Sequence, residues 1–236
     1  MLYSSYLSYL SYSSYPLMSH PFEAQLARIR ETLLRMSALT EQNLSLATRA
    51  LIERDNALAD QVEAADTEID QLEIHMDDLV VTYMSTHGPM ARDSRLMLIA
   101  SKTSSDLERI ADQATTIARR ARMLSQEPPL LVVMDDISTM AAMTKELLND
   151  TITAFVEARG ELAQSVIPRD KEIDALNRNI AQKLTALMIE NPANVTRSLH
   201  LMTIAKALER AADHVQNIAE DVFYLYSGQD IRHESM

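Results

Sequence analysis

Apolar residues recur every three or four positions along most of the chain, which is the spacing of one face of an α-helix. One segment shows the pattern with Ile69, Leu72, Met76, Leu79, Val80 and Tyr83, and a later one with Leu107, Ile110, Ala111, Ala114, Ile117 and Ala118. Helices of this kind bury their apolar face against neighbouring helices. The pattern therefore predicts an all-α fold.

Glycine and proline predict where these helices begin and end. The three glycines fall where helical patterns stop, at Gly88, Gly160 and Gly228, and three prolines are placed to open helices, at Pro21, Pro89 and Pro192. Pro128-Pro129 is the strongest break. We expect six long helices near 21–54, 56–87, 90–126, 131–159, 161–190 and 194–227. Inside the fifth, Pro168 should kink the helix or split off its first turn.

The chain also matches itself at a shift of about one hundred residues. Asp66-Thr-Glu-Ile-Asp70-Gln-Leu72 matches Asp170-Lys-Glu-Ile-Asp174-Ala-Leu176, and Leu107-Glu-Arg-Ile-Ala-Asp112 matches Leu208-Glu-Arg-Ala-Ala-Asp213. This repeat predicts a tandem duplication of a three-helix bundle. We place the first bundle at 18–127 and the second at 130–228, with tails at 1–17 and 229–236.

The tail at 1–17 has a composition unlike the rest of the chain. Five tyrosines recur at every third position among serine and leucine: Tyr3, Tyr6, Tyr9, Tyr12 and Tyr15. The tail has no positively charged N-terminal region and no clear hydrophobic region, so it does not resemble a signal peptide. Either the start codon is placed too early and Met18 is the natural start, or the tail is natural and binds a membrane or a partner.

Charge and composition narrow the class of protein further. The formal net charge is −12 with no large basic stripe, which argues against nucleic acid as a partner. An acidic surface attracts cations or basic protein patches, or it serves solubility alone. The absence of cysteine excludes disulfides and thiolate zinc sites and is consistent with a reducing compartment. No run of about 20 apolar residues is present, so no membrane-spanning helix is expected.

Each repeat carries two acidic pairs spaced four residues apart, a spacing that places both carboxylates on one helix face. The candidate metal ligands are Asp66, Asp70, Glu108, Asp112, Asp170, Asp174, Glu209 and Asp213. Clustered carboxylates are unfavourable alone but suit hard cations such as Mg²⁺, Ca²⁺, Mn²⁺ or Fe³⁺. A solvated helix face is the competing interpretation. Helical-wheel angles place Asp66, Asp70, Glu108 and Asp112 beside the apolar stripe, which predicts a shallow, open site.

The neighbours of these pairs refine the prediction. Glu73 and Asp77 extend the acidic stripe in the first repeat, whereas Asn177 and Ala181 stand at the matching positions of the second. The first repeat should therefore bind cations more strongly. Arg109 and Arg210 are expected to form ion pairs with Asp112 and Asp213, with anion binding as the alternative.

The histidines and the remaining motifs argue against enzymatic chemistry. His214 could be a ligand beside Asp213, but a surface position is expected. No histidine lies three residues after a glutamate, so the Glu-x-x-His pattern of di-iron bundles is missing. No P-loop or Ser/His/Asp spacing is present either. We therefore expect no catalytic residues and no bound organic cofactor.

Two motifs occur twice in this chain: Asp-x-x-Ile-Asp-x-Leu, and after it Leu-Glu-Arg-x-Ala-Asp. This arrangement resembles the PhoU family of phosphate-uptake regulators. The resemblance covers residues 21 to 228 and includes Ala91-Arg-Asp-Ser-Arg95 and Asp213-His through Asn217-Ile-Ala-Glu220. Ala111 and Ala212 stand where the family often has glycine, and their methyl groups could limit how closely a neighbouring helix approaches.

The resemblance implies two three-helix bundles related by a pseudo-two-fold axis and a non-enzymatic cytoplasmic adaptor. Such an adaptor links the ATPase subunit of a phosphate ABC transporter to a sensor histidine kinase, and it represses the phosphate-starvation response. It reaches the membrane only through these partners and can form a homodimer. The paired carboxylates, Asp66/Asp70, Glu108/Asp112, Asp170/Asp174 and Glu209/Asp213, would bind divalent or iron cations. The alternatives are an accessory protein of another phosphate or metal transporter, and a metal-binding structural bundle.

Overall fold

A computed structural model describes residues 21–87 and 91–231, and their side chains from 23 to 86 and from 93 to 231. Helices are the regular elements of this described part: α2 (Pro21–Glu53), α3 (Asn56–His87), α4 (Ala91–Ser125), α5 (Met134–Val156), α6 (Gly160–Val166), η1 (Ile167–Arg169), α7 (Asp170–Glu190), η2 (Pro192–Asn194) and α8 (Val195–Ser227). The predictions for the 1–17 tail, Gly88 and Pro89 lie outside the described residues, as does most of the C-terminal tail.

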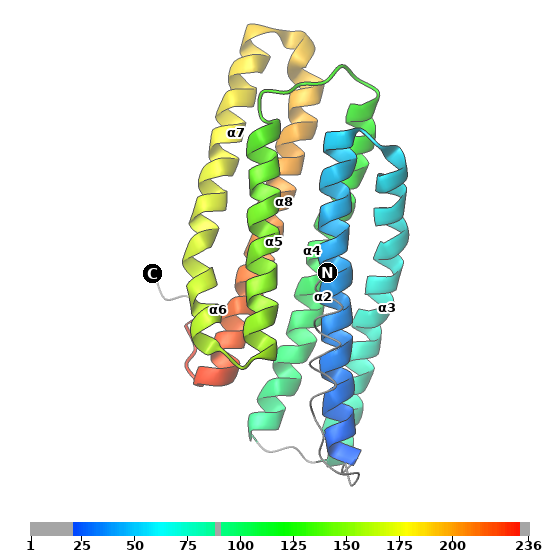
Figure 1. The fold of residues 1–236 in the computed structure, drawn as a ribbon, viewed down its shortest axis with the longest axis vertical. Helices are drawn as coiled ribbons and strands as arrows, with labels where there is room; N and C mark the ends of the chain where they lie inside the picture. Colours follow the sequence, from blue (N-terminus) through cyan, green and yellow to red (C-terminus); the bar gives the residue numbers. More distant parts are fainter. Residues whose placement is uncertain (1–20, 88–90, 232–236) are drawn as a thin grey trace.

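The helices run along one long axis and form an elongated molecule with two matching halves (Figure 1). In one half α2 and α3 pack on α4, and in the other α5, α6 and α7 pack on α8. The predicted duplication of a three-helix bundle is therefore confirmed. The most extensive helix pairing joins α4 to α8, so these two helices connect the halves and lie at the centre of the molecule.

A single hydrophobic core passes through both halves. It extends from Ile29 on α2 to Ile231 after α8. The residues whose spacing predicted buried faces on α3 and α4 are buried, Tyr83 completely, and only Val80 is half-buried. The apolar periodicity thus identified the faces that pack.

Three residues in the left-handed backbone region mark helix ends. Gly228 ends α8 with φ 75°, as its position predicted, because glycine has no Cβ to oppose this conformation. Arg54 after α2 and Ala158 after α5 adopt φ 57° and 56°. The expectation that Gly160 stops a helix is wrong, since Gly160 opens α6 and the chain turns at Ala158 instead.

The connection from α4 to α5 begins at the predicted break but is longer than expected. The helix predicted from 131 starts at Met134. Arg54 donates from Nη2 to the backbone oxygens of Ser125 at 2.8 Å and Glu127 at 2.6 Å. Arg197 donates to the Pro128 oxygen at 3.0 Å. These bonds satisfy carbonyl groups that a continuing helix would otherwise use.

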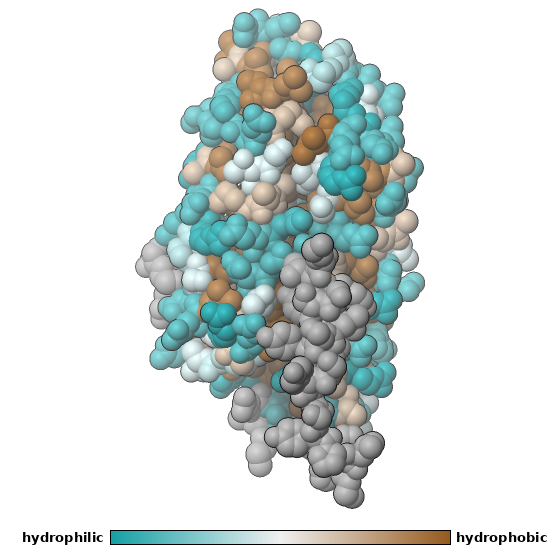
Figure 2. Space-filling model, in the orientation of Figure 1, coloured by the Kyte–Doolittle hydropathy of each residue, from teal (hydrophilic) through white to brown (hydrophobic). Residues whose placement is uncertain are grey.

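Exposed apolar surface gathers at this end of the molecule, where Figure 2 shows a hydrophobic area near the α4–α5 connection of Figure 1. Leu131 is 72 % exposed and Val132 49 % exposed.

Pro168 lies in η1 and separates α6 from α7, as its missing N–H and fixed φ predicted.

Candidate metal sites on two repeated acidic faces

In the first half, antiparallel packing brings the acidic pairs of α3 and α4 into electrostatic contact. Burial raises the pKa of Asp66, and the nearby charges of Asp70 and Asp112 raise it further. The pKa of Glu108 is raised to about 7, mainly by burial. The negative charge of Asp112 makes the next largest contribution, and those of Glu73 and Asp70 add to it. Carboxylates raise each other's pKa only at short range, so the two pairs share one face.

The second half repeats this arrangement on α7 and α8. Burial raises the pKa of Asp170 to about 6, and Asp213, Asp174 and Glu209 add to the effect. The pKa of Asp213 is raised by burial and then by Glu209. The structure therefore brings together the four predicted residues of each repeat.

The sites are less shallow than the helical wheels predicted. Glu209 is buried, with only 8 % of its surface exposed, and the Glu108 side chain is only 14 % exposed. The wheel prediction fails for Glu108, and the matching Glu209 is also buried, because α4 and α8 are the central helices and neighbours cover them on several sides. Ala111 and Ala212 are also buried, at the positions where their methyl groups contact the packed interior.

Basic side chains partly neutralise each face. Arg109 lies 3.4 Å from both Glu108 Oε2 and Asp112 Oδ2, which confirms the ion pair expected with Asp112. The corresponding pair of Arg210 with Asp213 is not found among the described residues. On that face Lys206 contacts Glu209 at 2.5 Å, and Arg178 contacts Asp174 at 3.6 Å.

The donor set fits a hard cation in its chemistry. Asp170 Oδ1 is buried and accepts no hydrogen bond, and Glu108 Oε2 is buried and has only the ion pair with Arg109 at 3.4 Å. A buried carboxylate oxygen that accepts no hydrogen bond is costly, and a cation would relieve that cost. Within 23–86 and 93–231, however, no three acidic or histidine side chains converge closely enough to hold one metal ion as they stand. Binding would thus require side-chain rotation on both faces.

His214 occupies a position that the sequence did not predict. Instead of lying free on the surface, it is partly buried, and its Nδ1 lies 2.8 Å from Asp106 Oδ1. The pair joins α8 to α4 across the two halves. Beside it, Lys102 reaches the buried Asp221 at 3.3 Å. Residues so far apart in sequence leave no local spacing signal, which is why sequence reasoning missed this polar seam.

No helix in the described part of the chain is long and apolar enough to cross a membrane.

The fold and its two acidic faces define a class of tandemly repeated helical bundles with matching carboxylate sites. The PhoU domain model matches residues 33–121 and again residues 137–222, one segment in each half. The chain belongs to the PhoU family.

Two relatives support this assignment across nearly the whole length. The phosphate-specific transport system accessory protein PhoU homolog of Pseudomonas putida is 37% identical in sequence. The match covers 92% of this chain and 84% of the relative's length. The phosphate-specific transport system accessory protein PhoU of Escherichia coli is 33% identical, and the match covers 92% of this chain and 89% of the relative's length.

Solved structures agree with the fold. The crystal structure of PhoU from Pseudomonas aeruginosa has a TM-score of 0.86 and 35% identity, covering 88% of this chain and all (100%) of that one. The PhoU structure from Streptococcus pneumoniae has a TM-score of 0.77 at 24% identity, which supports the fold alone. The chain is thus a member of a family of phosphate transport accessory proteins.

Proposed function

We propose that this protein is a cytoplasmic, non-enzymatic adaptor that restrains phosphate uptake and the phosphate-starvation response. It would contact the ATPase subunit of a phosphate ABC transporter and a sensor histidine kinase. Membership of a family whose relatives are described as transport accessory proteins supports this function. The observation that carries it is the repetition of a four-carboxylate face in both halves, with the pKa of Glu108 raised to about 7 and that of Asp170 to about 6.

Cations are the proposed ligands of these faces. Asp66, Asp70, Glu108 and Asp112 would hold one site, and Asp170, Asp174, Glu209 and Asp213 the other. A divalent or iron cation supplies positive charge that offsets the carboxylate repulsion and can bridge to a partner's surface. The first face should bind more strongly, because Glu73 adds a further negative charge near Glu108.

A paired pull-down and metal analysis tests the function. The tagged wild-type protein is compared with a fourfold variant of the first face: Asp66→Asn, Asp70→Asn, Glu108→Gln and Asp112→Asn. A matched control neutralises four exposed acids elsewhere: Glu23→Gln, Glu31→Gln, Asp135→Asn and Glu190→Gln. Samples from phosphate-replete cells are analysed for captured proteins and for bound metal by mass spectrometry.

The proposal expects that wild type and control capture a phosphate-transporter ATPase or a sensor kinase, and that the first-face variant loses both the partner and its metal. Capture of a different permease would favour an accessory role in another transport system. Tight metal binding without any partner would favour a structural bundle. If the variant captured the same partners and held the same amount of metal, these carboxylates would form only a solvated helix face with no role in binding.

A further inference from the structure

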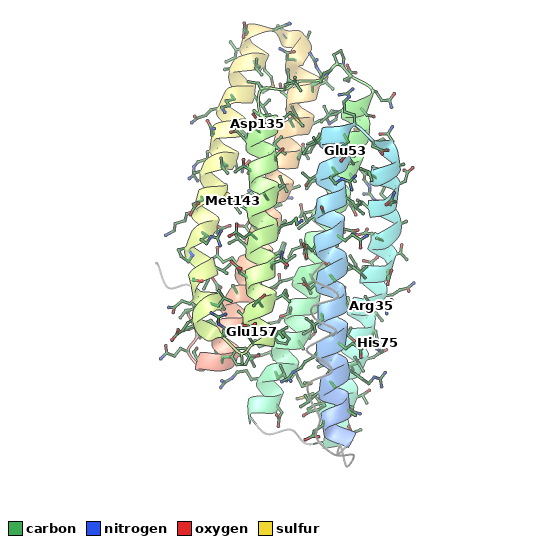
Figure 3. The ribbon with its side chains drawn as sticks, viewed as in Figure 1. Arg35, Glu53, His75, Asp135, Met143 and Glu157 are labelled. Atoms are coloured by element: carbon green, nitrogen blue, oxygen red, sulfur yellow. The ribbon has the colours of Figure 1, made fainter. Side chains whose placement is uncertain are left out.

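A second surface lies between α2 and α5, which run side by side in Figure 1. The two halves meet closely along α4 and α8, whereas α2 and α5 contact each other less, and a groove of roughly 710 Å³ separates them. Its apolar lining comes from both halves: Leu34, Leu39, Leu46 and Ile152. Small residues of α2, among them Ala38 and Ser45, keep it open. Figure 3 labels Arg35 on α2 and Met143 on α5, the helices on either side.

The lining of this groove holds more basic than acidic side chains, unlike the chain as a whole. Three basic residues line it, Arg35, Arg49 and Lys145, against one acid, Glu41, although the net charge of the protein is −12. A local excess of basic side chains favours a partner that is acidic.

Each basic residue is held by an ion pair that a partner could replace. Arg35 pairs with Glu68 at 2.5 Å and Arg49 with Glu53 at 2.8 Å, and the four side chains are 44 to 56% exposed. Lys145 lies 3.7 Å from Glu41. Exposed pairs contribute only about 0–1 kcal/mol, so a partner carboxylate can exchange for Glu68 or Glu53 at little cost.

The spacing of the charges sets the size of the occupant. Arg35 and Arg49 stand 14 positions apart on one helix, which corresponds to about 21 Å. One small anion cannot bridge that distance, whereas a helix of about 15 residues spans it. An apolar floor with only three cations in a strongly acidic protein suits a peptide better than a nucleic acid strand, whose phosphates need a continuous basic track.

We propose that the groove between α2 and α5 docks an acidic amphipathic helix of a partner protein. The apolar face of that helix would pack on Leu39, Leu46 and Ile152, and its flanking carboxylates would pair with Arg35, Arg49 and Lys145. This is the helix-in-groove mode of recognition. It requires neither carboxylate face, so it stands or falls independently of the proposed cation sites.

The test uses two synthetic peptides of about 16 residues, long enough to span the groove. Both carry leucine at helical spacing; the flanking positions hold glutamate in one and lysine in the other. Because the chain has no cysteine, Gln42→Cys gives a unique position in the groove for an environment-sensitive fluorophore. The proposal expects the glutamate peptide to bind at the label. It also expects that peptide to bind more weakly at about 500 mM than at about 50 mM NaCl, since salt screens the pairs.

Variants locate the binding. Arg49→Glu with Lys145→Glu should weaken the glutamate peptide by roughly tenfold or more. Ser45→Trp, which fills the groove without changing charge, should do the same. Arg159→Glu reverses a comparably exposed, paired arginine outside the groove and should leave affinity unchanged.

Three results would overturn the proposal. One is preference for the lysine peptide, as the net charge alone would give. Another is equal weakening by Arg159→Glu and the groove variants. The third is tighter binding of a single-stranded oligonucleotide with the same dependence on Arg49 and Lys145. Loss of cation binding in the first-face variant, by contrast, should leave peptide affinity unchanged.

Discussion

Of the carboxyl groups on the two acidic faces, Glu108 and Asp170 have the most strongly raised pKa values, and burial is the main cause. Their pKa values of about 7 and about 6 place both carboxyls near their titration at neutral pH. Protons and cations would therefore compete for these groups, because a cation requires the ionised form. A face built in this way is suited to reversible occupation.

The raised pKa of Glu108 makes a prediction about stability and pH. The folded state holds the proton more tightly than the unfolded state, whose pKa is near 4.5, so the native protein gains stability as pH falls from about 7 toward 4.5. Glu108→Gln removes this charge. It should raise the free energy of unfolding at pH 8 by roughly 1–3 kcal/mol relative to its effect at pH 5.

Urea unfolding of both proteins at the two pH values, without added metal, provides the measurement. Asp135→Asn, an exposed acid at the start of α5, serves as the control. An equal effect of Glu108→Gln at both pH values would mean that the carboxyl titrates normally.

At the scale of elements, the central position of α4 and α8 decides which predictions succeed. A helical wheel assumes one covered stripe, but these helices are packed by neighbours on several sides, so Glu108 and Glu209 sit deeper than expected. Contacts from other helices also explain the shorter α5. The connection before it is held by Arg54 and Arg197, whose hydrogen bonds stabilise a non-helical path.

Arg54 should therefore matter more than an ordinary exposed arginine. Arg54→Met keeps the aliphatic stem and the backbone but removes the donors to the Ser125 and Glu127 oxygens. We expect a loss of about 1–2 kcal/mol in the free energy of unfolding. Hydrogen exchange of the last turn of α4 should also become faster.

Arg159→Met gives the comparison, because Arg159 pairs only with the nearby Glu157 among the contacts described. Denaturant unfolding and amide exchange of the two variants are measured side by side. Equal stability of both variants would show that the connection does not depend on these bonds.

At the scale of the whole molecule, one core and one polar seam unite the two repeats. The core is continuous from α2 to the end of α8. The seam adds Lys102 with Asp221, Asp106 with His214, and Arg95 stacked 4.8 Å from the Tyr224 ring. Both acidic faces are consequently carried by helices that share one packed core.

A shared core predicts cooperative unfolding of the two halves. Leu208→Ala removes a buried side chain on α8 and should cost about 2–5 kcal/mol. Because the cost falls on a common core, amide exchange of the most protected residues of α3, in the other half, should accelerate as well.

Leu131→Ala is the matched control, since the same chemical change at a 72 % exposed position should have little effect. Hydrogen exchange followed by mass spectrometry reports both halves at once. If protection of α3 stayed constant in Leu208→Ala while α8 lost its own, the halves would be independent domains.

The sequence by itself determined the all-α class, most helix ends and the duplication, and it singled out eight carboxylates as candidate metal ligands. These are local properties, because apolar spacing, prolines and repeated motifs act within one helix or between copies of it. The tertiary structure alone decided how deep Glu108 and Glu209 lie, that His214 meets Asp106, and that Arg49 and Lys145 share a groove. Burial and long-range pairing depend on which helices become neighbours, and that is settled only when all the apolar faces pack together.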